Sequence, residues 1–379
     1  MKKIIYCLIL SLIACELNDP DQYVLSADFD ENDKIFVVFL PQDPVKELIV
    51  KLSEYENVGV ILASADDKES AESTLIDLGA KIENVSFFPI PDLDIWVRDN
   101  GPAIVKNRNG QLRAVDFRSN VIEFENNDQN IARELNIPLV RSKLRSVGGA
   151  RESNGEGTVI MTENYFDIKT DSKRKKMIEE ELKKICGVDR VIWLKKGLIE
   201  DEAFAKGPIF QNIYPVGSGG HIDEFCRFVN KNTVLLAEVQ GADHTNHPIN
   251  VENHNRLEEN MAILKEFEIN DIHVIRIPTA DLMFDKYVDP SNGREYETVI
   301  MASYLNFVIG NKVVIAAKYF EDGMMQTVKD KDDKVKEILQ GLFPNHKIIQ
   351  INPKYLNSWG GGYHCMTYNL PKQKNNNEK

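Results

Sequence analysis

Apolar segments of strand length alternate with helical segments along most of this 379-residue chain. In order, the first five are the strand Lys34–Leu40, the helix Pro44–Tyr55, the strand Val58–Ala63, the helix Lys68–Leu78 and the strand Val85–Ile90. Strands that are apolar throughout are typical of sheets that helices cover on both faces. The alternation therefore predicts an α/β protein.

The same alternation continues to the end of the chain. Further helices are predicted at 128–135, 173–185, 251–267 and 328–342, and further strands at 159–161, 191–194, 273–277 and 347–351. The segment 304–319 reads as a hairpin around Gly310 and Asn311. The repeated strand–helix–strand order suggests pseudo-symmetry, but the sequence shows no clean repeat and no linker that divides the core.

The N-terminus has the form of an export signal. Met1–Lys3 is positively charged, and the apolar segment Ile4–Ile13 is too short to span a bilayer as a mature helix. It ends in Leu-Ile-Ala-Cys, which resembles the bacterial lipoprotein signal, whose cysteine (here Cys15) carries the lipid. An ordinary cleaved secretory signal is the alternative. Either predicts an extracytoplasmic protein, and the first predicts a membrane anchor on the periplasmic or cell-surface side.

The chain is therefore expected to have four parts. They are a signal peptide over 1–15, a polar tether over 16–33, a folded region over 34–371 and a disordered tail over 372–379. The net charge of −13 argues against nucleic acid as the main partner and is compatible with a cationic ligand.

Three cysteines remain in the folded region, namely Cys186, Cys226 and Cys365. An odd number leaves at least one thiol unpaired unless a bond forms between molecules. Cys186 and Cys226 could pair and leave Cys365 free, or both could be buried thiols. Cys365 follows the glycines of Ser358–Thr367 (SWGGGYHCMT), and a glycine turn of this kind can present a nucleophilic thiol.

Two other motifs carry charged side chains. Ile95–Pro102 (IWVRDNGP) predicts a strand that ends in the pair Arg98–Asp99, and a structural ion pair is the alternative. In Gly219–Val229 (GGHIDEFCRFV), alternation along a strand would place His221 and Asp223 on one face, where they suit proton transfer. We expect no metal site at His244, His247 and His254, because Pro248 interrupts the segment.

These motifs together supply a thiol, an imidazole and two carboxylates, without a cofactor signature. A guanidinium group presents paired N–H donors, which two carboxylates can each accept in a bidentate manner. A thiolate could then attack the central carbon of that group.

WVRDNGP, GEGT, GHIDEFCRF, ASYLNF and GGGYHCMT occur here in the order and spacing of a known enzyme family. Over Ile35–Pro371 the chain resembles the agmatine deiminases and bacterial-type peptidyl-arginine deiminases. The resemblance implies a single domain with the pentein fold, a five-bladed α/β propeller of ββαβ units around a pseudo-fivefold axis that carries the active site.

The resemblance also implies a role for each site residue. Cys365 would be the nucleophile, Asp99 and Asp223 would bind the guanidinium nitrogens, and His221 would be the acid and base. His364 is a poorer base, because neighbouring side chains on an extended segment point apart. No metal or cofactor is implied. The residues assigned to the substrate pocket are Asp99, Asp223, Trp96, Arg98, Gly149, Asn306 and Gly361.

The expected reaction is hydrolytic deimination of a guanidino compound to a ureido product and ammonia through a covalent cysteine intermediate. Val147, Gly362 and the longer segment between Leu194 and His221 depart from the usual agmatine deiminase pattern. Agmatine, which would imply putrescine biosynthesis, and peptidyl-arginine both remain possible substrates. The alternatives from other classes are a non-catalytic lipoprotein that binds guanidino ligands, a protease-type cysteine hydrolase and an amidinotransferase. The oligomeric state is not predicted.

Overall fold

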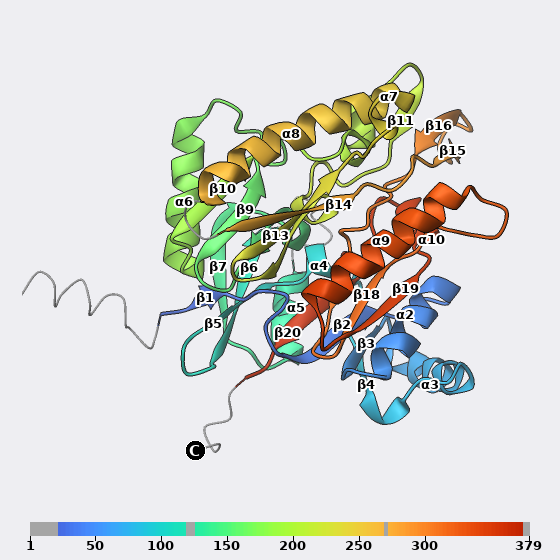
Figure 1. The fold of residues 1–379 in the computed structure, drawn as a ribbon. Coiled ribbons are helices and arrows are strands. Elements are labelled where there is room, and N and C mark those ends of the chain that lie inside the picture. The colour runs from blue at the N-terminus through green and yellow to red at the C-terminus, as the bar shows by residue number, and fades with distance from the viewer. Residues whose placement is uncertain (1–21, 119–125, 269–271, 374–379) are drawn as a thin grey trace, which may run out of the picture.

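The computed structural model of the chain describes residues 22–118, 126–268 and 272–373. Within these ranges the strands form six sheets of three or four strands each. In Figure 1, the helices α6 (Ser172–Cys186) and α8 (Pro248–Glu268) lie along the left and upper edges of the molecule, and α9 (Gln326–Leu342) lies on its right-hand side. The predicted α/β class is confirmed.

Five of these sheets share one unit in the described part of the chain. Two antiparallel strands are followed by a helix and by a third strand that runs parallel to the second. The units are β5 (Ala103–Lys106), β6 (Leu112–Arg118), α5 (Asn127–Glu134), β7 (Leu139–Arg145); β8 (Glu152–Ser153), β9 (Thr158–Thr162), α6, β10 (Arg190–Leu194); β12 (Cys226–Asn230), β13 (Thr233–Glu238), α8, β14 (His273–Pro278); β17 (Val308–Ile309), β18 (Val313–Ala317), α9, β19 (Lys347–Ile351); and β20 (Thr367–Pro371), β2 (Asn32–Val38), α2 (Asp43–Ser53), β3 (Val58–Leu62).

The fifth unit joins the two ends of the folded chain. β20 pairs with β2, with Asn32 opposite Pro371 and Val37 opposite Thr367. The strand β4 (Val85–Pro89) extends this sheet beyond β3, and the helix α3 (Lys68–Asp77) connects β3 to β4. The strand that carries the C-terminal glycine turn is thus held against the first long strand of the domain.

Other elements stand outside the five units. They are the sheet of β11 (Ile213–Pro215), β15 (Phe284–Val288) and β16 (Glu295–Val299), and the short helices α4 (Val97–Asn100), α7 (Asp243–Asn246) and α10 (Lys354–Asn357). The long helices lie close to their predicted bounds, and Gly187 ends α6 in the left-handed conformation at φ 60°. The predicted 304–319 hairpin is shorter than expected, since its strands begin only at Val308.

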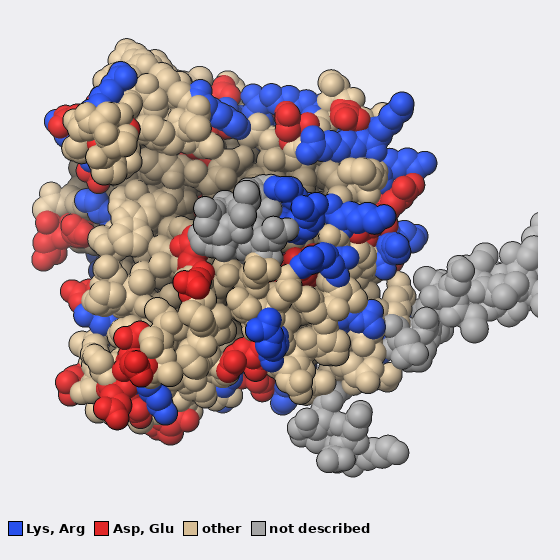
Figure 2. Space-filling view, turned by 180° about the vertical axis from the view of Figure 1, so that it is seen from behind, with Lys and Arg blue, Asp and Glu red and all other residues tan. Residues whose placement is uncertain are grey.

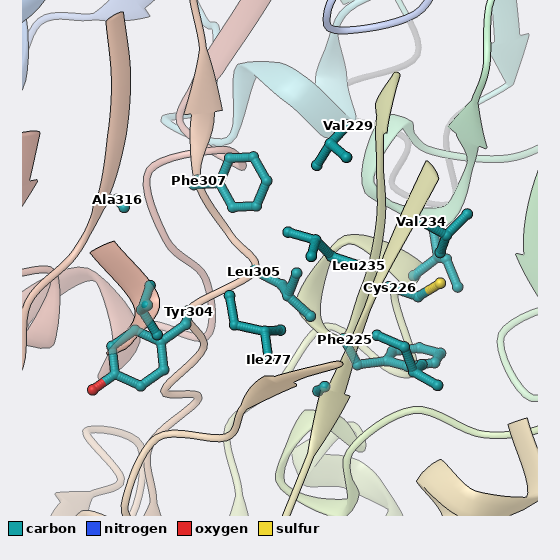
Figure 3. Packing of buried hydrophobic residues seen from close by; sticks show 14 of the residues in the cluster. Phe225, Cys226, Val229, Val234, Leu235, Ile277, Tyr304, Leu305, Phe307 and Ala316 are labelled. Carbon is teal, nitrogen blue, oxygen red and sulfur yellow. The ribbon is translucent and has the colours of Figure 1, made fainter. Parts of the chain in front are cut away.

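The largest apolar core crosses the boundaries between units. It joins residues of β9, β10, β12, β13, α8, β14, β18 and α9. In Figure 3, Phe225 and Leu235 of one unit lie near Leu305 and Ile277, and Phe307 precedes β17 of the next unit. This cluster connects three of the five units, and three further clusters connect the other two units to them and to each other. The five units therefore pack against one another through shared apolar contacts.

The described part of the predicted tether is packed against the domain. β1 (Val24–Leu25) pairs with β5, and Leu25 and Ala27 are buried against the domain. Asp28 forms ion pairs with Arg98 and Arg227. The polar composition of this stretch predicts a tether, but composition does not show that Leu25 and Ala27 pack against the domain or that Asp28 is paired. The predicted signal peptide, Cys15, the tether up to residue 21 and the tail from 374 lie outside the described residues.

Charge is unevenly distributed over the surface. Figure 2 shows Lys and Arg side chains gathered on the side of the molecule where α6 and β7 lie. Exposed basic residues of these two elements are Arg141, Lys143, Arg145, Lys173, Arg174, Lys176, Lys183 and Lys184. Among the described residues, no helix has both the length and the apolar character needed to cross a bilayer.

Candidate active site

The structure brings Cys365, His221, Asp223 and Asp99 together in one largely buried cluster, which is called the pocket below. Cys365 Sγ lies 3.7 Å from Asp223 Oδ2, and His221 Nδ1 lies 3.8 Å from Asp99 Oδ2. Gly149 connects the two pairs, because a Cβ atom at this position would lie 2.7 Å from His221 Nδ1 and 3.0 Å from Asp223 Oδ1. Its amide donates a hydrogen bond of 2.8 Å to Asp99 Oδ1. Residues from four distant parts of the sequence therefore meet here.

Asp99 lies in the short helix α4 and not at the end of a strand, so the predicted strand at Ile95–Val97 is wrong. The amides of Asp99 and Asn100 both donate to the carbonyl of Trp96, which closes a helical turn. Gly101 and Pro102 then end that turn. The amide of Arg98 also donates to the carbonyl of Cys365, so α4 is bonded directly to the backbone of the thiol.

His221 and Asp223 do not lie on a strand either. His221 precedes a single 3₁₀ turn, Ile222–Glu224, and β12 begins only at Cys226. The preceding Gly219 and Gly220 have φ values of 105° and 107°, which a strand of residues with side chains would not adopt. The prediction that alternation places both side chains on one face was wrong, although the two groups do meet in the pocket.

Asp201 holds the glycine turn before His221. Its Oδ1 accepts hydrogen bonds from the amide and hydroxyl of Ser218, and its Oδ2 accepts from the amides of Gly220 and His221. In the sequence, Asp201 stands out only as part of the acidic stretch Glu200–Glu202. Asp201 is fully buried, and burial raises its pKa, while His221 and the Ser218 hydrogen bonds act in the opposite direction.

The glycines before Cys365 allow two close approaches. A Cβ atom at Gly361 would lie 2.8 Å from the Trp96 ring, and one at Gly362 would lie 2.6 Å from Asn306 Oδ1. Each is closer than carbon or oxygen neighbours tolerate. Trp96 and Asn306, which the sequence analysis assigns to the substrate pocket, therefore pack against the turn that presents the thiol.

Asn306 and Glu224 bind the thiol from the other side. Asn306 Oδ1 accepts from the amides of His364 and Cys365, and its Nδ2 donates to Glu224 Oε1 at 2.8 Å and lies 3.0 Å from Cys365 Sγ. Glu224 Oε1 lies 3.7 Å from the same sulfur. Sequence reasoning missed Glu224, although it stands next to Asp223 in the motif that carried the resemblance.

The pocket is strongly acidic around a buried thiol. Burial raises the pKa of the Cys365 thiol well above its ordinary value, and the carboxylates of Asp223, Glu224 and Asp99 raise it further. Burial and the neighbouring carboxylates likewise raise the pKa of Asp223 and of Glu224. Within the described residues, Asp223 Oδ1, Glu224 Oε2 and His221 Nδ1 are buried without a hydrogen-bond partner. The pocket thus offers acceptors suited to a cation.

The raised pKa of Cys365 predicts that its thiol reacts slowly with alkylating reagents in the ligand-free protein. We expect alkylation of Cys365 by iodoacetamide to be slower at pH 7 than that of a free thiol and to keep accelerating up to about pH 9. Quantitative peptide mass spectrometry at several pH values measures this rate. Cys186 is the internal control, because burial raises its pKa to about 12. A rate that levels off near neutral pH would contradict the prediction.

A buried ionic layer lies behind the pocket. Arg227 is fully buried and donates to the carbonyls of Leu305 and Phe307, to Asp28 Oδ2 at 2.8 Å, and to Glu152. Arg98 donates to Asp28 Oδ1 at 2.9 Å and to Asn369. The sequence analysis assigns Arg98 to the substrate pocket, but its guanidinium donates to Asp28 and Asn369 in this layer.

Two clusters of three potential metal ligands lie in this region of the described chain. They are Asp28, Glu152 and His364, and Asp223, Glu224 and Cys365. In the first cluster, Arg98 and Arg227 already neutralise the carboxylates. The second is the acceptor set of the pocket itself, which can also receive the N–H groups of an organic cation.

The family model of the Porphyromonas-type peptidyl-arginine deiminases matches residues 40–371. The chain belongs to this family. Agmatine deiminases from Ectopseudomonas mendocina and from Pseudomonas aeruginosa strain UCBPP-PA14 are each 28% identical to it, and each alignment covers 84% of both chains. The family resemblance predicted from the motifs is thereby confirmed.

Solved structures show the same fold. The agmatine deiminase of Enterococcus faecalis matches with a TM-score of 0.74 and 21% identity, over 93% of this chain and 96% of that one. A substrate-bound C. jejuni agmatine deiminase matches with a TM-score of 0.70 and 21% identity, over 93% and 97% of the two chains. The deiminase fold therefore extends over almost all of the described residues.

Proposed function

We propose that this member of the family hydrolyses a guanidino group to a ureido group and ammonia through a covalent bond to Cys365. The observation that most directly supports this proposal is the position of the buried Cys365 thiol. It lies among the carboxylates of Asp223, Glu224 and Asp99, with His221 in the same pocket. A planar cation with several N–H donors complements these acceptors. Protease-type cysteine hydrolysis would instead need donors aimed at an oxyanion.

The first half of the reaction forms the covalent intermediate. Asp223 and Asp99 hold the guanidinium with its central carbon near Cys365 Sγ. The bound cation offsets the negative charge that raises the pKa of the thiol, so that the thiol can pass its proton to His221 and become a thiolate when substrate is present. Sγ attacks the carbon, the bond from carbon to one terminal nitrogen breaks, and His221 supplies the proton with which ammonia leaves.

The second half regenerates the enzyme. His221, which has lost its proton, takes one from a water molecule, and the resulting hydroxide attacks the carbon of the amidino-thioether. The carbon–sulfur bond then breaks and releases the ureido product. Position 149 must be glycine for this arrangement, because a side chain there would collide with both His221 Nδ1 and the Asp223 carboxylate.

The surroundings of the pocket favour a substrate with a carboxylate over agmatine. A hollow of about 690 Å³ includes Tyr165 and Gly219, and the Tyr165 ring lies 5.1 Å from the His221 ring. Its basic residues outnumber its acidic ones. The charged residues that line it are Lys169, Lys196, Lys206, Arg256, Asp167 and Glu202. The ammonium end of agmatine would meet repulsion there, whereas the carboxylate of free or C-terminal arginine would not.

The deciding experiment compares substrates on the purified protein under reducing conditions. Ammonia and ureido product are measured with agmatine, free arginine, a peptide with C-terminal arginine and the same peptide with its carboxylate amidated. We expect turnover of arginine compounds with a free carboxylate to exceed that of agmatine. Ligand binding without ammonia from any compound would instead indicate the non-catalytic guanidino-binding protein.

Asp99→Asn should lower kcat/KM by roughly 10²- to 10³-fold, because the amide offers one acceptor and one donor where the guanidinium needs acceptors. The Oδ1 atom can still accept from the Gly149 amide, so the melting temperature should change little. Asp92→Asn is the matched control, since Asp92 is exposed and its φ of 60° suits asparagine. Near-normal kinetics of the Asp99 variant would make this carboxylate structural.

We also propose that the five units surround a pseudo-fivefold axis with the pocket on it, as in a pentein propeller. Support comes from their common strand order and from site residues that lie between units: Asp99 before β5, Gly149 before β8, His221 and Asp223 before β12, Asn306 before β17 and Cys365 before β20. The proposed export signal and lipid anchor at Cys15 rest on the sequence alone. Radiolabelled palmitate incorporation, compared between the protein and Cys15→Ala, tests the anchor.

A further inference from the structure

His364 stands between two carboxylates, one in the pocket and one behind it. Its Nδ1 lies 2.6 Å from Asp223 Oδ2, and its Nε2 lies 2.6 Å from Asp28 Oδ2. His364 and Asp223 are buried, and only about a sixth of the Asp28 side chain is exposed, 16%. The three groups form an unbroken chain from the N-terminal segment to the proposed guanidinium-binding site.

The proton count of this chain is fixed by its geometry. A neutral imidazole has one N–H donor, and ionised carboxylates only accept. Two contacts of 2.6 Å therefore require two protons among the three groups. Either His364 carries both as an imidazolium, or it carries one and a carboxyl group carries the other. The two forms differ only in the position of one proton.

The charged neighbours decide which carboxyl group is protonated. Burial opposes ionisation of Asp28, but Arg98, a hydrogen bond from His364, and Arg227 hold its pKa well below the ordinary value. Burial, Arg227 and Arg98 lower the pKa of His364. Burial raises the pKa of Asp223, as does Asp99. In the ligand-free protein, Asp28 is thus the anion, His364 is neutral with its proton on Nε2, and Asp223 is the acid.

We propose that His364 is a proton acceptor for Asp223. It takes the Asp223 proton when a guanidinium enters the pocket, which leaves Asp223 as a carboxylate, and it returns the proton to Asp223 when the site is empty. In this step the O–H bond of Asp223 Oδ2 breaks and an N–H bond forms at His364 Nδ1. The resulting imidazolium donates to Asp28 through Nε2 and to Asp223 through Nδ1. No proton is exchanged with solvent.

The charged groups around the chain act in both directions, since Arg227 favours the ionised form of Asp223 while the neighbouring carboxylates oppose it. The charged groups that face the chain from neighbouring elements are Asp99, Asp201, Glu224, Glu152, Arg98 and Arg227. The first three place negative charge beside Asp223 and favour its neutral form until a cation arrives. Arg98 and Arg227 oppose a charge on His364, and Asp28 offsets them. This inference rests on the proposed guanidinium-binding function and adds a positioning residue to it.

The test counts protons on binding in the Cys365→Ala background, which removes ionisation of the thiol. Agmatine and a peptide with C-terminal arginine are titrated by calorimetry at pH 7 in buffers of different ionisation enthalpy. With His364 intact, the proton of Asp223 stays in the protein. In Cys365→Ala/His364→Gln, glutamine can bond but cannot take up a proton, so about one additional proton per ligand should be released. Equal proton release by the two proteins would overturn the proposal.

His273→Gln in the same background is the matched control, because His273 is an exposed histidine of β14. It should release as many protons as the parent. The affinity of the His364→Gln variant should also fall about tenfold per pH unit below the pKa of Asp223, whereas that of the parent falls less steeply.

Nitrogen-15 spectra of the histidine rings test the same proposal without changing His364. In the ligand-free Cys365→Ala protein, we expect a neutral ring with its proton on Nε2, and agmatine or the peptide should convert it to an imidazolium. A ring that is already an imidazolium without ligand, or that stays neutral with ligand bound, would overturn the proposal. If neither compound binds, the deiminase function fails, and the ligand-free spectrum still decides whether His364 starts as an acceptor.

Discussion

Cys365→Ala should abolish turnover, with a loss on the order of 10⁴-fold or more in kcat. The alanine variant cannot form the bond to the guanidinium carbon, and nothing else in the pocket is a comparable nucleophile. Because burial and the surrounding carboxylates raise the pKa of the thiol, it is neutral in the ligand-free protein, and alanine removes no charge. The fold should therefore remain intact, with the melting temperature within a few degrees of the parent.

Cys186→Ala is the matched control for this variant. Cys186 is a free, buried thiol at the end of α6, and it packs in the apolar cluster that contains Ile178 and Leu182. Its loss should cost stability, by about 1 kcal/mol, but leave kcat unchanged. Ammonia release and single-turnover trapping of the intermediate measure both proteins. Full activity of Cys365→Ala would exclude the covalent mechanism.

Asp223→Asn should reduce kcat/KM by about 10³-fold while making the ligand-free protein at least as stable as the parent at neutral pH. The kinetic loss follows because an amide cannot become the anion that the guanidinium needs. The gain in stability follows because burial raises the pKa of Asp223, so the folded state must keep a proton that the unfolded chain gives up.

The sign of this stability effect sets the pH window. As the pH rises above about 3.9, the pKa of an unfolded aspartate, the free energy of unfolding of the parent falls. It stops falling when the pH reaches the raised pKa of Asp223 in the folded state. Asparagine has no such cost. The melting temperatures of the two proteins should thus be closest near pH 4 and diverge towards pH 8, with the variant higher. A variant that melts below the parent at pH 8 would mean that the Asp223 carboxylate stabilises the empty site.

The periodic elements could be predicted from sequence because they are long and apolar on the correct period. The helices α6, α8 and α9 and the parallel strands β3, β10 and β19 lie close to their expected positions. The short strands β8 and β17, of two residues each, carry too few residues for any period to be visible. Their pairing depends on partners elsewhere in the chain, which a local pattern cannot show.

The two wrong strand predictions have a common cause. Before Asp99 and around His221, local apolar residues suggested strands, but the backbone bends to satisfy hydrogen bonds with Trp96 in one case and Asp201 in the other. Nothing local to His221 reveals that Asp201 caps the turn before it. Side chains that serve a pocket are often carried by bent backbone, so local patterning fails there most.

The chemical groups in the pocket were easier to predict than the layer that supports them. Cys365, His221, Asp223 and Asp99 stand in motifs whose spacing carried the family resemblance. Asp28 could not be found in this way, because it stands 336 residues from His364 in a polar, acidic stretch. Glu224 was available in the motif itself, and its adjacency to Asp223 was the overlooked signal.

The pairing of β2 with β20 places a constraint on biosynthesis. The strand that completes this sheet is synthesised after all the other described strands, and Cys365 is bonded through its carbonyl to α4, which comes much earlier in the chain. A nascent chain can therefore form most of its units early but cannot assemble a reactive pocket until β20 has been made. Premature termination anywhere before residue 365 yields a protein without a nucleophile and with an open sheet edge, which is a target for proteolysis rather than a partly active enzyme.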